Sequence, residues 1–259
     1  MARDFGVASV YGDPEELFRR EKLDFVDAVT DVDTHSKFVH MAVAHKLPVI
    51  CQKPMAPPLE VATEMVKACV DSRVPMFVNE NSRWQTPIRQ MKSVLDSGAI
   101  GTPFRARIDM ITGYPVFRNQ PFLGELEQFI LTDLGSHILD AARFLFGGAH
   151  SLYCQTRRIH AHIKGEDVAT VVMRMGSRTT VLAEMAYAEN ALERECFPQT
   201  LMFIEGEQGS AEICPDYKIH VTTSNGTLSK PYPPPRYAWA DPEYATRWRE
   251  RRPVRFLAS

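Results

Sequence analysis

Val49-Ile50-Cys51-Gln52-Lys53-Pro54 has the composition of a buried strand that ends at a lysine followed by a proline. Apolar, β-branched residues are typical of parallel strands, and a proline cannot continue the ladder of hydrogen bonds. In an open α/β sheet, the residue that follows such a strand faces the crevice in which ligands bind. A solvated lysine in an ordinary strand-to-helix loop would have the same local sequence, so the rest of the chain decides between the two interpretations.

The overall composition is that of a globular protein. The chain has 259 residues, of which 44% are hydrophobic and 24% are charged, and its formal net charge is −2. This balance gives no electrostatic reason to expect a nucleic acid or an anionic membrane as a partner. Charges interrupt every apolar run, and the N-terminus lacks the apolar core of a signal peptide, so we expect no membrane span.

The cysteines indicate a reducing compartment. They are odd in number, widely scattered and without the CxxC spacing of a metal or redox site. We therefore expect reduced thiols, buried as small apolar side chains in a cytoplasmic protein, and no bound metal. The five cysteines are Cys51, Cys69, Cys154, Cys196 and Cys214.

Short apolar strands alternate with helices in the first part of the chain. This alternation predicts right-handed βαβ crossovers and a parallel sheet of the Rossmann type, an α/β domain. Residues 3–6 have the composition of the last turn of a helix. The expected strands are 7–11, 25–30, 47–51 and 75–78, of which the last two are expected to be buried. The expected helices begin at Asp13 and cover 34–45, 57–71 and 87–97.

A different pattern begins near residue 100. Residues 104–110 alternate with period two, as a half-buried strand does, and a long helix is expected over 129–146. The pattern then predicts an open, mostly antiparallel sheet with a covering helix, an α+β domain. Its further strands are expected at 151–158, 168–175, 179–187, 200–205, 210–214, 218–222 and 226–229.

The long helix carries a polar cluster. Asp133, His137 and Asp140 are at positions i, i+4 and i+7, so they lie on one helical face. A carboxylate one turn before an imidazole can orient it, which suits general acid–base chemistry. A histidine that is merely hydrogen-bonded on an ordinary helix is the alternative interpretation.

Together these motifs resemble the Gfo/Idh/MocA oxidoreductase family, which is named for glucose–fructose oxidoreductase and inositol dehydrogenases. The resemblance rests on their order: an alternating α/β half, a strand ending in QKP where the family has EKP, and a strand ending in Asn79-Glu80-Asn81-Ser82-Arg83-Trp84. A helix with the pattern DxGxHxxD, from Asp133 to Asp140, then precedes an open sheet. The resemblance covers roughly residues 3–240.

The resemblance implies an enzyme that transfers hydride between a sugar, polyol or related alcohol and NAD or NADP. It implies that Lys53 is the catalytic lysine, that His137 accepts the substrate proton and that Asp133 binds substrate and supports the histidine. It also implies the cofactor-binding residues, which are Thr30, Asp31, His35, Gln52, Lys53, Asn79 and Arg83.

The same resemblance sets our expected domain organisation. Residues 1–100 would form a partial dinucleotide-binding domain, 101–240 a substrate and oligomerisation domain, and 241–259 a tail. Residues 113–128 would be an irregular loop over the substrate. We expect a homo-oligomer through the C-terminal sheet, at residues 168–187, because the family often pairs subunits there.

The sequence departs from the family pattern in two respects. Gln52 replaces a glutamate, which keeps the hydrogen-bonding ability but removes the charge. No GxGxxG occurs, although its glycines let the backbone approach a pyrophosphate. We therefore expect a fragment, a misplaced start or a degenerate copy, with a bare apolar edge at the 25–30 strand. One alternative to a dehydrogenase is a non-catalytic remnant that oligomerises or binds a small ligand. Another is a dehydratase or glycosidase-like reaction that starts with oxidation, as the resemblance also allows.

Overall fold

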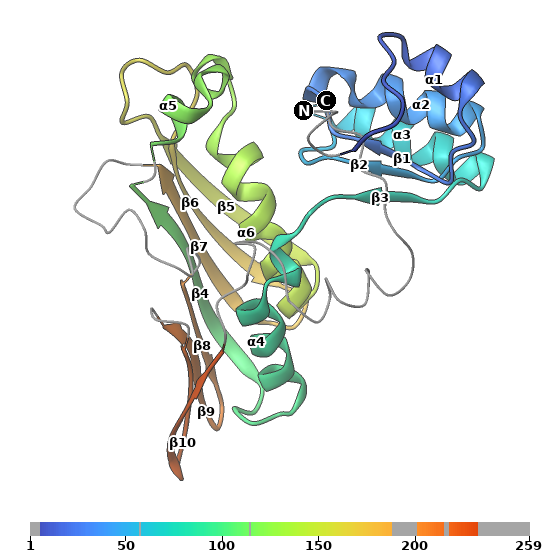
Figure 1. The fold of residues 1–259 in the computed structure, drawn as a ribbon. Coiled ribbons are helices and arrows are strands. Elements are labelled where there is room, and N and C mark those ends of the chain that lie inside the picture. Colours follow the sequence, from blue (N-terminus) through green and yellow to red (C-terminus); the bar gives the residue numbers. More distant parts are fainter. Residues whose placement is uncertain (1–5, 57, 114, 188–200, 215–217, 233–259) are drawn as a thin grey trace. The chain divides into compact units, whose positions relative to one another are not determined.

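The computed structural model describes residues 6–56, 58–113, 115–187, 201–214 and 218–232. They form two compact units, one up to Glu80 and the other from Asn81 (Figure 1). The sequence pattern changes later, near residue 100. The units divide earlier because the helix α4 (Thr86–Asp96) packs against the strands of the second unit.

The first unit is a parallel sheet with crossover helices, which confirms the predicted Rossmann-type fold. Its strands lie in the order β1-β2-β3, and α2 and α3 make the two crossovers (Figure 1). The elements of this unit are α1 (Pro14–Arg20), β1 (Val26–Ala28), η1 (Val32–Thr34), α2 (His35–Ala44), β2 (Val49–Cys51), α3 (Leu59–Ser72) and β3 (Met76–Val78).

Local chemistry explains where these elements begin and what they bury. The Asp13 side chain accepts a hydrogen bond from the backbone N–H of Glu15 at 3.0 Å, and Pro14 occupies the first helical position of α1. The strands are short and mostly apolar. Val49 on β2 is fully buried, in one cluster with Val39 of α2 and Met65 of α3. Apolar burial between the sheet and both helices is therefore what holds this unit together.

Two predictions about the strands of this unit were wrong. Residues 7–11 form no strand, because no described strand lies beside them to complete a ladder. β3 is not buried, because it is an edge strand whose Phe77 is 60% exposed. The helix end expected at residues 3–6 falls mostly outside the described residues, and so does the tail.

The second unit contains an eight-stranded sheet in the order β11-β10-β9-β8-β4-β7-β6-β5. All neighbours are antiparallel except β4 and β7, which confirms the predicted open sheet. The strands are β4 (Pro103–Thr112), β5 (Ala149–Arg157), β6 (Val168–Met175), β7 (Thr180–Tyr187), β8 (Leu201–Gly206), β9 (Gly209–Cys214), β10 (Lys218–Thr223) and β11 (Gly226–Pro231).

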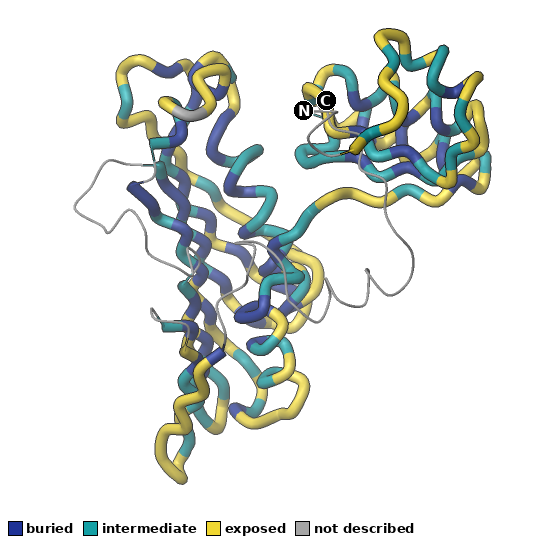
Figure 2. The backbone as a smooth tube through the Cα atoms, in the orientation of Figure 1, coloured by how far each residue is buried: buried dark blue, intermediate teal, exposed yellow. Residues whose placement is uncertain are grey.

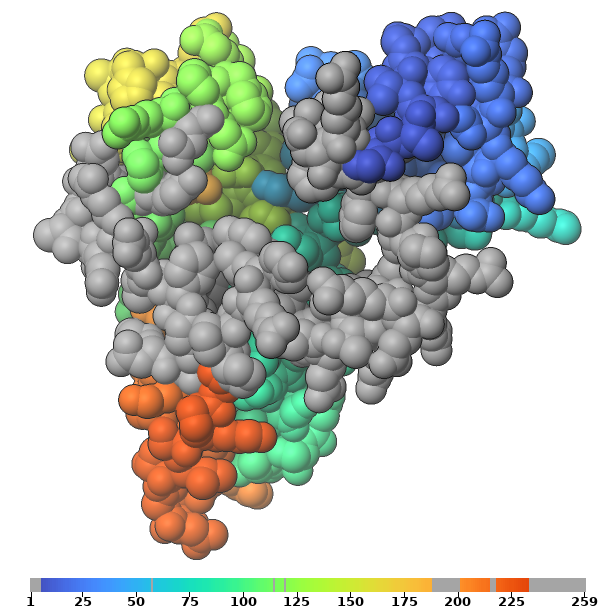
Figure 3. All heavy atoms as spheres, in the orientation of Figure 1, coloured from blue at the N-terminus to red at the C-terminus, as the bar shows by residue number. Residues whose placement is uncertain are grey.

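Helices cover one face of this sheet. α6 (Ile130–Phe146) packs on β4, β6 and β7, while α4 packs on β9 and β10. In Figure 3, the last strands (orange) lie beside the region of α4 (green). Alternate residues of the strands are buried beneath these helices, as Ile108 and Ala183 show (Figure 2). We call the opposite face of the sheet the outer face. Among the described residues, no helix is both long enough and apolar enough to span a membrane.

The hairpin between β8 and β9 docks against the turn that precedes β4. The backbone N–H of Gln208 donates to the carbonyl of Ile100 at 2.9 Å, and that of Glu207 donates to Thr102 at 3.1 Å. This approach leaves no room for a side chain at Gly206, where a Cβ would lie 2.2 Å from the Ile100 carbonyl oxygen. Glycine at this position is therefore a requirement of the docking.

Gly206→Ala is expected to destabilise the second unit by about 1–3 kcal/mol or more, because the hairpin must move away from Ile100. Urea unfolding followed by circular dichroism measures the change. Gly148→Ala is the matched control, since nothing lies within 4 Å of a Cβ there, and it should stay within about 0.5 kcal/mol of the wild type. Equal effects of the two substitutions would contradict the docking argument.

Candidate active site

The carboxyl ends of the three parallel strands meet at one edge of the first unit. Ala28, Cys51 and Val78 are in register across the sheet. The backbone N–H of Gln52 donates to the Ala28 carbonyl at 3.2 Å, and the N–H of Asn79 donates to the Cys51 carbonyl at 2.8 Å. The residues that follow each strand therefore lie beside one another, at the edge where open α/β sheets bind ligands.

The buried side chain of His35 stabilises the loops at this edge. Its side chain is 1% exposed, and Nε2 lies 3.0 Å from the carbonyl oxygen of Thr30. On the other side of the ring, Nδ1 lies 3.1 Å from the carbonyl oxygen of Pro54 and 3.2 Å from that of Met55. Since the ring contacts the loops after β1 and β2 together, its visible role is to position them.

The other predicted residues of this edge offer polar groups. Gln52 Oε1 accepts a hydrogen bond from the backbone N–H of Lys53 at 2.9 Å, so its side chain folds over the end of β2. Lys53 is half-buried, and its peptide bond to Pro54 is cis. Thr30 and Asp31 are exposed in the loop after β1. The edge thus carries an ammonium, an amide, a carboxylate and a hydroxyl within one unit.

These residues fit one half of a dinucleotide. Hydroxyl, amide and ammonium groups at adjoining strand ends suit a nicotinamide and its ribose. A glycine-rich turn for the pyrophosphate does not occur in the sequence, and no described strand pairs with the outer edge of β1. The residue types of the described edge therefore suit the nicotinamide end of a dinucleotide, and they include no glycine-rich turn for the pyrophosphate.

The start of α6 is fixed by an acidic residue from a neighbouring loop. Glu166 Oε1 accepts from the backbone N–H groups of Phe129 at 3.2 Å and of Leu131 at 3.4 Å, while its own carbonyl accepts from Ile130 at 3.0 Å. A carboxylate at this place satisfies N–H groups that the first helical turn leaves without partners, and it complements the helix dipole. The first turn that carries Asp133 is thereby held in place.

Asp133 and His137 lie one helical turn apart on the half-buried face of α6. The hydroxyl of Tyr187, at the end of β7, donates to Asp133 Oδ2 at 3.2 Å. Tyr187 is itself stacked on Phe129, with ring centroids 5.6 Å apart. We did not single out Tyr187 from the sequence as a site residue, because its link to Asp133 joins a helix to a distant strand and leaves no local signal.

Arg83 and Asp140 form an ion pair within the second unit. Arg83 Nε donates to Asp140 Oδ2 at 2.6 Å, and Nη2 donates to the other carboxylate oxygen, so the pair is bidentate. The guanidinium also lies 5.5 Å from the ring centroid of Phe144. The pair ties η2 (Ser82–Trp84) to α6. Its cofactor-binding role stays a prediction, and the visible function of Arg83 is to anchor this segment.

A cavity of about 470 Å³ opens beside Tyr187. The region 113–128, expected as an irregular loop, supplies one wall through α5 (Val116–Asn119) and η3 (Pro121–Glu125). His160 also lines the cavity, and its Nδ1 lies 2.5 Å from Oδ2 of the fully buried Asp167. Aromatic and basic groups in one cavity suit a small polar molecule such as a sugar.

Family models match both parts of the chain. Residues 1–80 match the oxidoreductase family model with an NAD-binding Rossmann fold, and residues 88–212 match the GFO/IDH/MocA C-terminal domain. The chain belongs to the Gfo/Idh/MocA oxidoreductase family. This membership confirms the resemblance on which the site prediction rests, while the role of each site residue stays a prediction.

Named relatives within the family are sugar dehydrogenases. The chain is 44% identical to a D-apiose dehydrogenase of Rhizobium rhizogenes, over 91% of this chain and 68% of that protein. It is 41% identical to a D-apiose dehydrogenase of Paraburkholderia graminis, over 91% of this chain and 63% of that protein. The chain thus spans about two thirds of the length of these relatives.

A solved structure of high similarity has the same fold. It is an oxidoreductase from Agrobacterium radiobacter in complex with NAD+, L-tartaric acid and magnesium. The TM-score is 0.88 at 42% identity, and the match covers 94% of this chain and 71% of that one. A levoglucosan dehydrogenase complex with NADH and levoglucosan shares the fold at 20% identity, with a TM-score of 0.78, 90% of this chain and 67% of that one.

His35→Ala is expected to lower the free energy of unfolding by about 1–3 kcal/mol, because it removes the buried ring that contacts the carbonyls of Thr30 and Pro54. Urea unfolding followed by circular dichroism measures it. His40→Ala is the control, since His40 is exposed and bonds only within its own helix, to the Ser36 carbonyl at 2.7 Å. An unchanged midpoint for His35→Ala would show that the ring does not hold the two loops.

Proposed function

We propose that this protein is an NAD-dependent dehydrogenase that oxidises a sugar hydroxyl, with D-apiose as the first substrate to test. The observation that carries this proposal is the 44% identity to a D-apiose dehydrogenase over 91% of the chain. NAD is favoured over NADP because the similar Agrobacterium radiobacter structure was determined with NAD+. The polar strand ends of the first unit and the Asp133–His137 pair of the second supply the residue types that this chemistry needs.

The residue roles follow from the chemistry of alcohol oxidation. NAD, when bound, accepts a hydride from the substrate carbon. His137 takes the hydroxyl proton at a ring nitrogen, and the ammonium of Lys53 stabilises the negative charge that develops on the oxygen. Asp133 binds a substrate hydroxyl and orients His137. Tyr187, through its hydrogen bond to Asp133, is a positioning residue.

The two units divide the work in this proposal. The first unit, up to Glu80, holds the nicotinamide end of the cofactor, and the second unit holds the substrate. The separate family matches at residues 1–80 and 88–212 support this division. The proposed cofactor contacts are Thr30, Asp31, Gln52, Lys53 and Asn79, with His35 and Arg83 holding the segments that carry them.

Lys53→Ala and His137→Ala should each lower kcat for D-apiose by about 10²–10⁴-fold, because each removes a group that handles the proton or the charge. NAD affinity should change little in His137→Ala, because His137 is not among the proposed cofactor contacts. Formation of NADH is followed by absorbance, and NAD binding by quenching of protein fluorescence. His150→Ala, at an exposed position of β5, is the matched control and should leave kcat unchanged.

The binding measurement separates the two functional hypotheses. If NAD at millimolar concentrations neither quenches the fluorescence nor raises Tm, the dehydrogenase proposal fails for this chain. The non-catalytic ligand-binding alternative would then hold. If NAD binds but D-apiose is not oxidised while another sugar or myo-inositol is, only the choice of substrate is wrong.

We also propose a homo-oligomer that forms through the outer face of the eight-stranded sheet. This face carries exposed apolar side chains, among them Val172 and Phe203, each 39% exposed. Its charges are largely balanced, because Arg107 Nε lies 2.9 Å from Asp109 Oδ2 and 3.0 Å from Glu184 Oε2. An apolar face with internally paired charges suits contact with a second copy.

Val172→Asp is expected to shift the protein toward the monomer, because it places an unpaired charge in the contact. Light scattering coupled to gel filtration measures the mass. Leu59→Asp is the control, since Leu59 is 75% exposed on α3 of the other unit and should leave the mass unchanged. A monomeric wild type would refute the interface.

We propose a cytoplasmic location for the protein. Four of its cysteines, Cys51, Cys69, Cys154 and Cys214, are free thiols, which fits a reducing compartment.

A further inference from the structure

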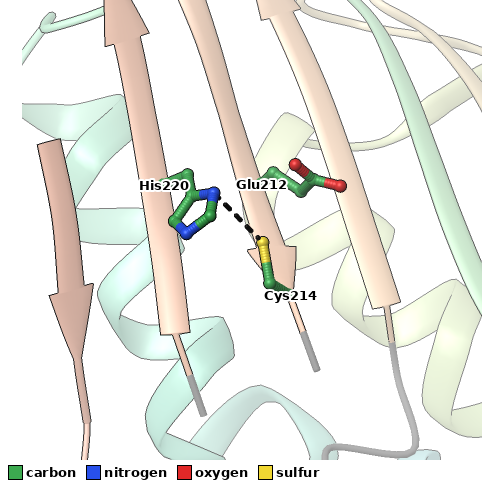
Figure 4. Close-up of side chains that lie close together, drawn as sticks. All are labelled: Glu212, Cys214 and His220. Carbon is green, nitrogen blue, oxygen red and sulfur yellow. Dashed lines mark hydrogen bonds between the residues drawn. The ribbon is translucent and has the colours of Figure 1, made fainter. Parts of the chain in front are cut away.

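Three potential metal ligands project together from the outer face of the sheet. Glu212 and Cys214 lie two residues apart on β9, and successive side chains of a strand alternate, so both face the same way. His220 lies directly opposite Glu212 on the neighbouring antiparallel strand β10. Figure 4 shows the Cys214 thiol and the His220 ring turned toward one another, with the Glu212 carboxylate on the same face but extending away from His220. The register of β9 and β10 therefore gathers a carboxylate, a thiol and an imidazole.

The spacing of the donor atoms is close to that of a metal site. One ligand atom from each residue lies within 4.8 Å of the other two. The Cys214 Sγ and His220 Nδ1 atoms are 3.5 Å apart. Donor atoms of a tetrahedral zinc site lie about 3.4–3.6 Å apart, given Zn–S and Zn–N bonds of about 2.3 and 2.0 Å. The sulfur and nitrogen already have this separation, and the exposed Glu212 side chain needs only to rotate inward.

The kinds of ligand select the ion. Thiolate and imidazole are ligands of Zn²⁺, whereas Mg²⁺ and Ca²⁺ prefer oxygen ligands alone. We propose that Glu212, Cys214 and His220 bind one Zn²⁺ ion, with a water molecule in the fourth position. One thiolate and one carboxylate balance the charge of the ion, so the bound site is neutral on this half-exposed face.

One apolar side chain borders the cluster. Phe203 of β8 lies directly opposite Glu212 on its other side and gives the cluster one apolar neighbour.

The proposed ion would pin β9 to β10 near the end of the sheet. A ligand that binds only the folded state stabilises it by mass action. Zinc at 100 times its Kd should therefore raise Tm by about 5–10 °C for a protein of this size. The cysteine spacing in the sequence indicated no metal, because the ligands come from two strands and only the register unites them.

The test is a titration of the full chain, freed of metal with a chelator, with Co²⁺ as a spectroscopic substitute for Zn²⁺. We expect one Co²⁺ per chain, a thiolate-to-cobalt charge-transfer band in the near ultraviolet, and loss of the band when Zn²⁺ is added. Cys214→Ser should abolish the band. His220→Gln and Glu212→Gln should weaken binding at least about tenfold, the loss typical of removing a residue from a metal site.

Cys154→Ser is the matched control, because Cys154 is also a half-exposed free thiol of a strand, on β5 at the other end of the sheet. It should keep both the band and the affinity. The proposal is overturned if wild type gives no band at millimolar Co²⁺, or if the band survives Cys214→Ser. Should Cys214→Ser fail to fold, unchanged zinc affinity in Glu212→Gln, whose side chain is exposed, together with His220→Gln would overturn it as well.

Discussion

The parallel hydrogen bonding of β1, β2 and β3 is the constraint on which the first unit depends. The ladder continues past the strands themselves, since Gln52 and Asn79 still donate to the carbonyls of the preceding strand. This brings residues that are more than twenty positions apart along the chain to one edge. His35 adds a second link, because its buried ring contacts the loops after β1 and β2 together. The polar edge is thus produced largely by backbone geometry.

In the second unit, an apolar sheet fixes the orientation of a helix that also carries a polar face. α6 buries Ile138 and Ala142 on β4, β6 and β7, and this packing turns Asp133 and His137 to the helix side that stays partly accessible. Glu166 fixes the first turn and the Arg83–Asp140 pair fixes the middle of the helix. A helical face that is fixed at two points along its length loses little entropy when a ligand binds to it.

Much of this organisation could be predicted from the sequence, because periodicity and caps are local signals. The limits of α6 and β6 follow directly from apolar spacing and from Gly147. The errors arose where a partner decides the outcome. Residues 7–11 have the composition of a strand, but none of the described strands lies beside them, and β3 is apolar yet lies at an edge. The Tyr187–Asp133 contact was missed for the same reason, since nothing local in either segment indicates it.

The cysteines show most clearly why composition alone does not assign chemistry. Cys51 and Cys214 both stand in strands and both were expected to be inert. Cys51 is fully buried, and burial together with Asp27 and Cys69 raises its pKa to about 11, so it holds its proton and packs as an apolar side chain. Cys214 is half-exposed and has other neighbours. A one-residue shift in the register of β9 and β10 would separate it from His220 and turn it to the helix-covered face. Its capacity to bind a metal therefore belongs to the pairing of two strands and not to the cysteine itself.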